Sequence, residues 1–123
     1  MLIRVYYEDT DCCGIVYHSN YISFCERARS ELFFSKGLSP HSSEYFFVAR
    51  HLEAEFIKSA KLGDMLDIKC ENITKKRASL CMEQNIYKEK ELIFSLKITL
   101  VYVHNEKACK IPEEVFDFFK TIK

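Results

Sequence analysis

Hydrophobic residues recur at helical spacing over residues 18–36. The apolar positions follow one another by three or four residues, as they do on the buried face of an α-helix. They are Tyr21, Phe24, Cys25, Ala28 and Leu32. Gly37 stands where a C-terminal cap is expected, and Ser19 or Asn20 is placed to cap the start. The pattern predicts one long helix.

Alternating apolar and polar residues predict strands in the rest of the chain. A short strand is expected at residues 1–7, and four more near 48–56, 66–71, 79–86 and 94–104. In the last of these, one face carries Phe94, Leu96, Ile98, Leu100 and Tyr102. In the segment near 48–56, the expected common face consists of Val48, Leu52, Ala54 and Phe56, with Arg50 as the polar exception.

A second, short helix is expected to begin at Pro112, a residue suited to the first helical position. Its apolar face comprises Ile111, Val115, Phe118, Phe119 and Ile122. The order is therefore strand, long helix, four strands and short helix. Consecutive strands joined by short turns favour an antiparallel sheet with the long helix across one face, which is an α+β fold.

Length, charge and hydropathy limit the number of domains and the classes of function that the chain can have. The 123 residues fit one domain spanning 1–123. Lysine plus arginine and aspartate plus glutamate each number 18, so the chain lacks the basic excess typical of nucleic-acid binding. No apolar run is long enough to span a membrane, and the N-terminal residues lack a signal-peptide pattern. We therefore expect a cytoplasmic protein that does not bind nucleic acid.

The six cysteines do not follow a metal-binding pattern. They form no CxxC pair, and the four histidines do not stand at zinc-like spacings from them. Adjacent Cys12 and Cys13 are poorly placed for an ordinary disulfide. We expect free thiols in a reducing compartment, no metal site and no cofactor.

A polar segment just before the long helix carries the candidate chemistry. Glu8, Asp9 and Asp11 lie within four residues of one another, ahead of His18. A helix N-terminus exposes unpaired N–H groups that can bind a carbonyl oxygen and stabilise an oxyanion, and a nearby carboxylate could then act on the carbon. The same acids could instead simply cap the helix and complement its dipole. Spacing alone leaves both interpretations open.

The surrounding residues resemble the signature of the 4-hydroxybenzoyl-CoA thioesterase family, in particular its Tol-Pal-associated, YbgC-type branch. The resemblance rests on Tyr6 to Asp11, Gly14, Val16-Tyr17-His18, Asn20-Tyr21, Glu26-Arg27-Ala28-Arg29 and the turn Lys58 to Asp64. It implies a hotdog fold, in which a curved antiparallel sheet wraps around a long central helix, with a short C-terminal helix. Cys12-Cys13 depart from the small residues usual there, which raises the question of redox sensitivity more than of activity.

The resemblance also implies an acyl-CoA thioesterase that releases free fatty acid and coenzyme A without a metal. It assigns Asp11 as the catalytic carboxylate, either general base or nucleophile. His18 would offer its backbone N–H to the thioester oxygen, with its imidazole assisting, and Tyr7 would lie near the site. The alternatives are a capping or packing role for His18 and a core position on a strand for Tyr7.

The basic triplet Lys75, Lys76 and Arg77 lies between two predicted strands. It can be a solvated hairpin tip, or it can bind the phosphates of coenzyme A. Family members bind the nucleotide near this part of the sheet, so the triplet is the candidate substrate-binding set. Lys58 and Lys61 lie in the preceding turn region.

The sequence also bears on the oligomeric state and on two other candidate functions. An unpaired edge strand and an outer face that is apolar at Val101 and Val103 predict a homodimer, or a homotetramer formed as a dimer of dimers. A hotdog dehydratase would pair a histidine with an acid on the facing subunit, and the match from Asp11 to Gly14 speaks against it. The remaining alternative is a non-catalytic module that binds coenzyme A or acyl groups, or that partners cell-envelope or lipid-synthesis proteins.

Overall fold

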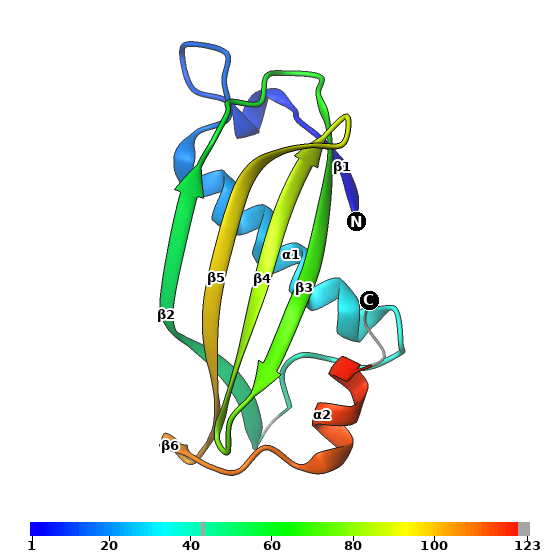
Figure 1. Cartoon of the computed structure of the whole chain (residues 1–123), viewed down its shortest axis with the longest axis vertical. Helices are drawn as coiled ribbons and strands as arrows, with labels where there is room; N and C mark the ends of the chain where they lie inside the picture. Colours follow the sequence, from blue (N-terminus) through cyan, green and yellow to red (C-terminus); the bar gives the residue numbers. More distant parts are fainter. Residues whose placement is uncertain (43, 121–123) are drawn as a thin grey trace.

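The computed structural model describes residues 1–42 and 44–120. The elements follow one another as shown in Figure 1. They are β1 (Leu2–Arg4), the 3-10 turn η1 (Tyr7–Asp9), α1 (His18–Phe34), β2 (Tyr45–Phe56), β3 (Met65–Lys75), β4 (Ser79–Lys88), β5 (Glu91–His104), β6 (Lys107–Ala108) and α2 (Glu113–Lys120). The predicted order is confirmed, and η1 and the two-residue β6 are additions that the pattern did not reveal. No helix of the described residues is long and apolar enough to cross a membrane.

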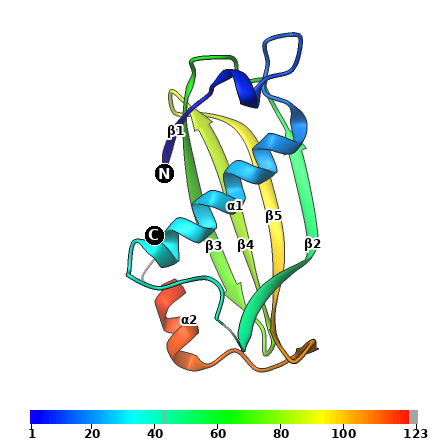
Figure 2. The same ribbon diagram turned by 180° about the vertical axis from the view of Figure 1, so that it is seen from behind.

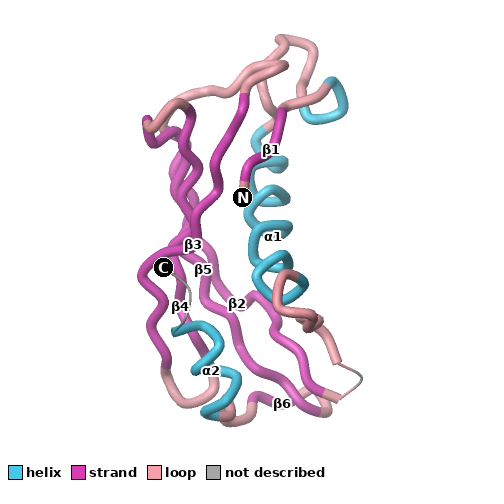
Figure 3. Tube along the Cα trace, turned by 90° about the vertical axis from the view of Figure 1, so that its right-hand side faces the viewer, coloured by secondary structure: helices cyan, strands magenta, loops and turns pink. Residues whose placement is uncertain are grey.

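The strands form one antiparallel sheet in the order β1-β3-β4-β5-β2, with β6 added to β5. The sheet curves around α1, which crosses its concave face diagonally (Figures 2 and 3). At its N-terminal end α1 lies toward β2, and at its C-terminal end it lies toward β3 (Figure 1). The predicted curved sheet around one long helix, with a short C-terminal helix, is therefore confirmed.

The predicted faces of α1 and β5 form the core. Tyr21, Phe24, Cys25 and Ala28 of α1 are buried, and Leu32 packs against them. They face the buried side chains of Phe94, Leu96, Ile98 and Leu100 on β5. Burial of apolar side chains from both layers is the main favourable contribution to folding.

The C-terminal cap of α1 is the predicted one, whereas its N-terminal cap is not. Gly37 has φ +73°, and its N–H donates to Phe34 O while Leu38 N–H donates to Phe33 O, which is the expected glycine-terminated Schellman motif. The predicted caps Ser19 and Asn20 are wrong, because both lie inside the helix. Tyr17 is the N-cap residue and contributes no side-chain hydrogen bond. The side-chain amide of Asn20 instead donates a hydrogen bond to Asp9 O in the segment before the helix.

The predicted common face of β2 is partly wrong because the strand contains a bulge. The register with β5 shifts between Ala49 and His51, so Arg50 is an extra residue. The bulge reverses the alternation of side chains on its two sides. Leu52, Ala54 and Phe56 pair with inward-facing residues of β5, as expected, but Ala49 shares their face and Val48 points to the outer face opposite Val101.

The outer face of β5 is less exposed than predicted. Val101 and Val103 are buried within the single chain. Val101 is flanked by Val48 on β2 and Ser79 on β4, and Val103 by Phe46 and Ala108. Neighbouring strands on both sides, including the unforeseen β6, therefore cover these valines without a second subunit.

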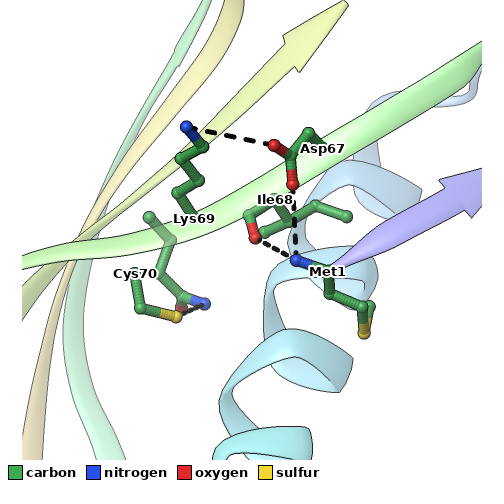
Figure 4. Close-up of polar contacts among 6 residues, drawn as sticks. Met1, Asp67, Ile68, Lys69 and Cys70 are labelled. Carbon is green, nitrogen blue, oxygen red and sulfur yellow. Dashed lines mark hydrogen bonds and ion pairs between the residues drawn. The ribbon is translucent and has the colours of Figure 1, made fainter. Parts of the chain in front are cut away.

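The first strand is shorter than the predicted residues 1–7. Leu2 to Arg4 pair with Asp67 to Met65 of β3. The terminal ammonium of Met1 lies 2.8 Å from Ile68 O and 3.4 Å from Asp67 Oδ1, and Asp67 also faces Lys69 at 4.0 Å (Figure 4). At the other end, α2 begins one residue after Pro112, whose carbonyl accepts from its first turn. Ile111 and Phe119 are buried as predicted, and Ile122 lies outside the described residues.

Candidate active site

Asp11 opens a tight turn at the end of the sheet where α1 begins. Asp11 O accepts from Gly14 N–H at 3.0 Å, and Asp11 N–H donates to Ile15 O at 2.9 Å. Asp11 Oδ1 accepts from Cys13 N–H at 2.8 Å, a local bond that aspartate side chains favour in turns. Gly14 has φ +78°, which a residue with a side chain adopts only with strain. The turn fixes one carboxylate oxygen, and Oδ2 accepts no hydrogen bond from the described residues.

The first turn of α1 faces the same region. Asp9 O accepts from Tyr17 N–H at 3.0 Å and from the Asn20 side-chain amide at 2.9 Å. These two bonds attach the helix start to the segment that leads into Asp11. The N–H groups of His18 and Ser19 donate to no acceptor in the described part of the chain, as expected for the first helical positions. They carry the positive end of the dipole of a 17-residue helix.

The turn after β2 holds the other wall of the site. Val16 N–H donates to Ala60 O at 2.9 Å, and Ile15 and Lys61 form a further bridge. Ala60 N–H donates to the hydroxyl of Tyr21 at 3.0 Å. Burial raises the pKa of Tyr21, so its hydroxyl stays neutral at physiological pH. The turn is thereby bonded both to the Asp11 turn and to α1.

These three segments enclose a pocket of about 270 Å³. Its lining residues are Asp11, Ile15, Val16, Tyr17, His18, Tyr21, Phe56, Ile57, Lys58 and Ser59. The predicted pair Asp11 and His18 is therefore brought to one cavity. Of its aromatic lining residues, Phe56 contacts both the ring of Tyr21 and the imidazole of His18. Phe94 is buried outside the lining, and its ring centroid lies 5.1 Å from those of Tyr21 and Phe56.

The arrangement suits attack on a polarised carbonyl. A carboxylate with one free oxygen shares a partly apolar pocket with unpaired N–H groups at a helix start. Such N–H groups stabilise negative charge that develops on a carbonyl oxygen. In the described residues, no group of three or more histidine, cysteine, aspartate or glutamate side chains could hold a metal ion.

Tyr7 does not occupy the core position that was its alternative assignment. It lies on η1, not on a strand, and its side chain is 81% exposed. The strand ends early because the Asp9 carboxylate accepts from Tyr6 N–H at 2.9 Å while Asp9 N–H donates to Tyr6 O, which closes a short turn. Tyr7 is not among the lining residues of the Asp11 pocket. Asp9 is buried, and its carboxylate holds this turn, whereas Glu8 is exposed.

The single chain does not bring the basic triplet to this pocket. Lys75 to Arg77 lie at the β3–β4 turn, at the opposite end of the sheet from the Asp11 turn (Figure 1). Lys75 Nζ lies 2.9 Å from Glu113 Oε1 and over the ring of Phe116, so its charge is engaged by α2. Lys76 and Arg77 are exposed.

Sequence patterns missed several pocket residues. Phe56 was expected only as an apolar residue of a strand, Tyr21 as an apolar helix residue that also belongs to the family motif, and Lys58 and Ser59 only as part of a matching turn. The turn match was the available signal, because it marked residues 58–64 without showing that they lie against the Asp11 turn. Gln84 is another surprise: it is fully buried on the apolar face of β4, where it binds Arg29 at 2.7 Å and Cys25 O at 2.7 Å.

Comparison with known proteins gives consistent matches. The family model described as the thioesterase superfamily matches residues 13–94, a range that begins just after Asp11. An acyl-CoA thioesterase YbgC from Helicobacter pylori is 45% identical over 71% of this chain, and the match spans 65% of that protein. An acyl-CoA thioester hydrolase YbgC from Escherichia coli O157:H7 is 35% identical over 96% of this chain and 92% of its own length. A crystal structure of a probable thioesterase from Bartonella henselae is 33% identical, covers 91% of this chain and 97% of its own, and superposes with a TM-score of 0.83.

Proposed function

Because the chain belongs to the thioesterase superfamily and resembles its YbgC-type members, we propose that it hydrolyses acyl-CoA to free fatty acid and coenzyme A. The observation that carries the proposal is the pocket that joins the carboxylate of Asp11 to the uncapped start of α1. The relatives are named for this activity. The pocket supplies a carboxylate to promote attack on the carbonyl carbon and N–H groups to bind the carbonyl oxygen.

In the proposed reaction, the thioester carbonyl oxygen accepts a hydrogen bond from the His18 N–H at the start of α1. Asp11 either removes a proton from the water that attacks the carbonyl carbon, or attacks that carbon itself to form a mixed anhydride, which water then hydrolyses to the free acid and the regenerated carboxylate. The C–S bond breaks, and coenzyme A leaves as a thiolate that takes up a proton. A thiolate is a good leaving group, so one carboxylate and preorganised N–H groups suffice.

Release of thiol from acyl-CoA by the purified wild-type protein tests the function. We expect turnover that follows enzyme concentration and that persists after metal chelation. The competing hypothesis is a module that binds coenzyme A or acyl groups without catalysis. Saturable binding of acyl-CoA with no thiol released above the uncatalysed rate would favour that module and refute the enzyme.

Two sets of basic residues are proposed contacts for the coenzyme A phosphates. Lys58 lines the Asp11 pocket of the same chain, where its ammonium lies 2.6 Å from Glu91. The exposed Lys76 and Arg77, at the far end of the sheet, would reach a nucleotide only from a second copy, and Lys75 is held by α2. Phosphates attract both kinds of side chain.

Kinetics of alanine variants at these positions separate the two sets. We expect Lys58→Ala to raise KM for acyl-CoA with nearly unchanged kcat, because binding energy shared by ground and transition states affects KM alone. The effect should shrink as salt rises, since exposed charges are screened. A thioester lacking the nucleotide should not distinguish the variant from wild type. A KM effect in Lys76→Ala/Arg77→Ala but not in Lys58→Ala would assign the phosphates to the far triplet.

The proposed enzyme acts in the cytoplasm as a homodimer or as a dimer of dimers. The support is the edge strand β2, which has no outer neighbour in the described chain beyond one bridge between Phe46 and His41 and whose residues are largely exposed. Unpaired edges of this length are normally covered. Light scattering at low micromolar concentration should give at least twice the mass of one chain, and an active monomer would contradict the proposal. The proposed protein partners belong to lipid synthesis or to the cell envelope.

A further inference from the structure

The hydroxyl of Tyr21 keeps an unused hydrogen-bond donor inside the proposed active site. Tyr21 is 4% exposed and belongs to the lining of the Asp11 pocket. Its oxygen accepts from Ala60 N–H at 3.0 Å, whereas its own O–H donates to no residue in the described part of the chain. A neutral phenol carries one donor, and a buried donor without an acceptor costs free energy. This donor is therefore available to a molecule that enters the pocket.

The contacts of Ala60 place this hydroxyl on the same side of the pocket as Asp11. Ala60 O accepts from Val16 N–H at 2.9 Å. The adjacent Ile15 O accepts from Asp11 N–H, also at 2.9 Å. Ile15 and Val16 line the pocket, as do the two residues that precede Ala60. The hydroxyl therefore lies where the turn after β2 meets the Asp11 turn.

Tyr21 also lies on the face of α1 that begins at His18. It follows His18 by three residues, the spacing of neighbours on one helix face. Long side chains on a helix lean toward its N-terminus, so the phenol of Tyr21 reaches back toward the N–H groups that are proposed to bind the carbonyl oxygen. The ring of Phe56 contacts both side chains, with centroids 5.7 Å from Tyr21 and 6.5 Å from His18. The phenol O–H and the helix N–H groups are therefore donors to one small pocket.

Thioester hydrolysis needs a water molecule that is held beside a base and aimed at the carbonyl carbon. In the proposed function, the helix N–H groups bind the carbonyl oxygen and Asp11 supplies the carboxylate, but no second group positions the water. Resting on that function, we propose that Tyr21 is a further catalytic residue, whose O–H donates to the oxygen of the attacking water while Asp11 Oδ2 accepts the proton that the water loses. The water oxygen bonds to the carbonyl carbon, the C–S bond breaks and the thiolate leaves, whereas Tyr21 keeps its proton throughout. This arrangement assigns Asp11 as a general base.

Tyr21→Phe removes the donor and keeps the ring that stacks on Phe94 with centroids 5.1 Å apart. We expect kcat for acyl-CoA to fall by about tenfold or more, the effect of one hydrogen bond made in the transition state. KM should be nearly unchanged, because the hydroxyl does not bind coenzyme A. Tyr102→Phe is the matched control: this phenol is also partly buried, with its pKa raised by burial, but its N–H donates to Ala78 O at the far end of the sheet. An unchanged kcat in a folded Tyr21→Phe variant, or an equal loss in Tyr102→Phe, would overturn the proposal.

A fluorinated tyrosine at position 21 separates catalysis from support of the turn, because Tyr21→Phe also removes the acceptor of Ala60 N–H. Burial raises the pKa of Tyr21, so the wild-type hydroxyl keeps its proton at neutral pH. Ring fluorination lowers the pKa of the phenol. Above that pKa, the phenolate still accepts from Ala60 N–H but has no proton to donate. We therefore expect kcat relative to wild type to be kept below the phenol pKa and to fall as pH rises through it.

The ratio to wild type removes the titration of the other groups around the hydroxyl. These are Asp11, His18 and Lys58 in the pocket lining, and Asp64, whose negative charge also raises the pKa of Tyr21. All of them are present in both proteins. The same fluorinated tyrosine at position 102 should give a ratio that is constant with pH. A constant ratio for position 21 as well would confine Tyr21 to support of the turn and contradict its catalytic role.

Rapid mixing of Tyr21→Phe with acyl-CoA tests the order of events. Because the water reacts with the thioester itself, thiol and free acid should appear together. A burst of thiol before the acid appears would show that Asp11 forms the anhydride first, and would refute this role of Tyr21. A wild-type protein that releases no thiol overturns the proposed function and this inference with it. Wild-type turnover that Tyr21→Phe does not slow overturns the inference alone.

Discussion

Replacement of Asp11 by asparagine is expected to lower kcat for acyl-CoA hydrolysis by about a hundredfold or more, the scale of losing a catalytic base. Asparagine keeps a side-chain oxygen that can accept from Cys13 N–H, so the Asp11–Gly14 turn should persist. The substitution removes the negative charge and the proton acceptor while leaving the pocket shape nearly unchanged. Rates measured by thiol release under saturating substrate report the effect.

Glu8→Gln is the matched control for this experiment. It removes one carboxylate from the same segment, but Glu8 is exposed on η1 and lies outside the pocket lining. We expect a loss of less than about threefold, within the range usual for surface changes. Asp9 is unsuitable as a control because its buried carboxylate holds the turn at Tyr6. Near wild-type turnover in a folded Asp11→Asn variant would exclude Asp11 as the catalytic carboxylate.

The fold was largely predictable because periodicity reports burial. The stripe on α1 and the alternation on β5 both coincide with buried residues, since each element has one face against a single core. The errors have local physical causes. The β2 bulge at Arg50 reverses the alternation of side chains, and η1 depends on a hydrogen bond from Tyr6 N–H to the Asp9 carboxylate. Neither feature has a periodic signature.

The candidate site was predictable only through a motif. The spacing of Asp11 and His18 was also compatible with helix capping, and the family resemblance singled out these two residues. Their meeting in one pocket depends on long-range contacts with residues 58–64 and with Phe56, which no local pattern encodes. The basic triplet was misleading for the same reason. Its residues are adjacent in the sequence, but the fold places them at the far end of the sheet from the Asp11 turn.

The aromatic residue Phe94, buried behind the pocket residues Tyr21 and Phe56, leads to the prediction with the largest expected effect on stability. Phe94 is 0% exposed, stacks on Tyr21 with an interplanar angle of 16°, and contacts Phe56 with centroids 5.1 Å apart. Phe94→Ala removes a buried ring between α1 and two strands, and rigid neighbours cannot collapse fully into the space. We expect the free energy of unfolding to fall by about 3–5 kcal/mol. That is a large share of the total stability usual for one domain.

Urea unfolding of Phe94→Ala and Phe34→Ala, followed by circular dichroism, makes the comparison direct. Phe34 ends α1 and is 53% exposed, so the same change of side chain there should cost less than about 1 kcal/mol. Unchanged m-values would show that the midpoint shift reports stability. Because Phe94 supports Tyr21, which accepts from Ala60 N–H, the loss should also loosen the turn that lines the Asp11 pocket. Equal destabilisation by the two variants would contradict the assignment of Phe94 to the buried core behind this pocket.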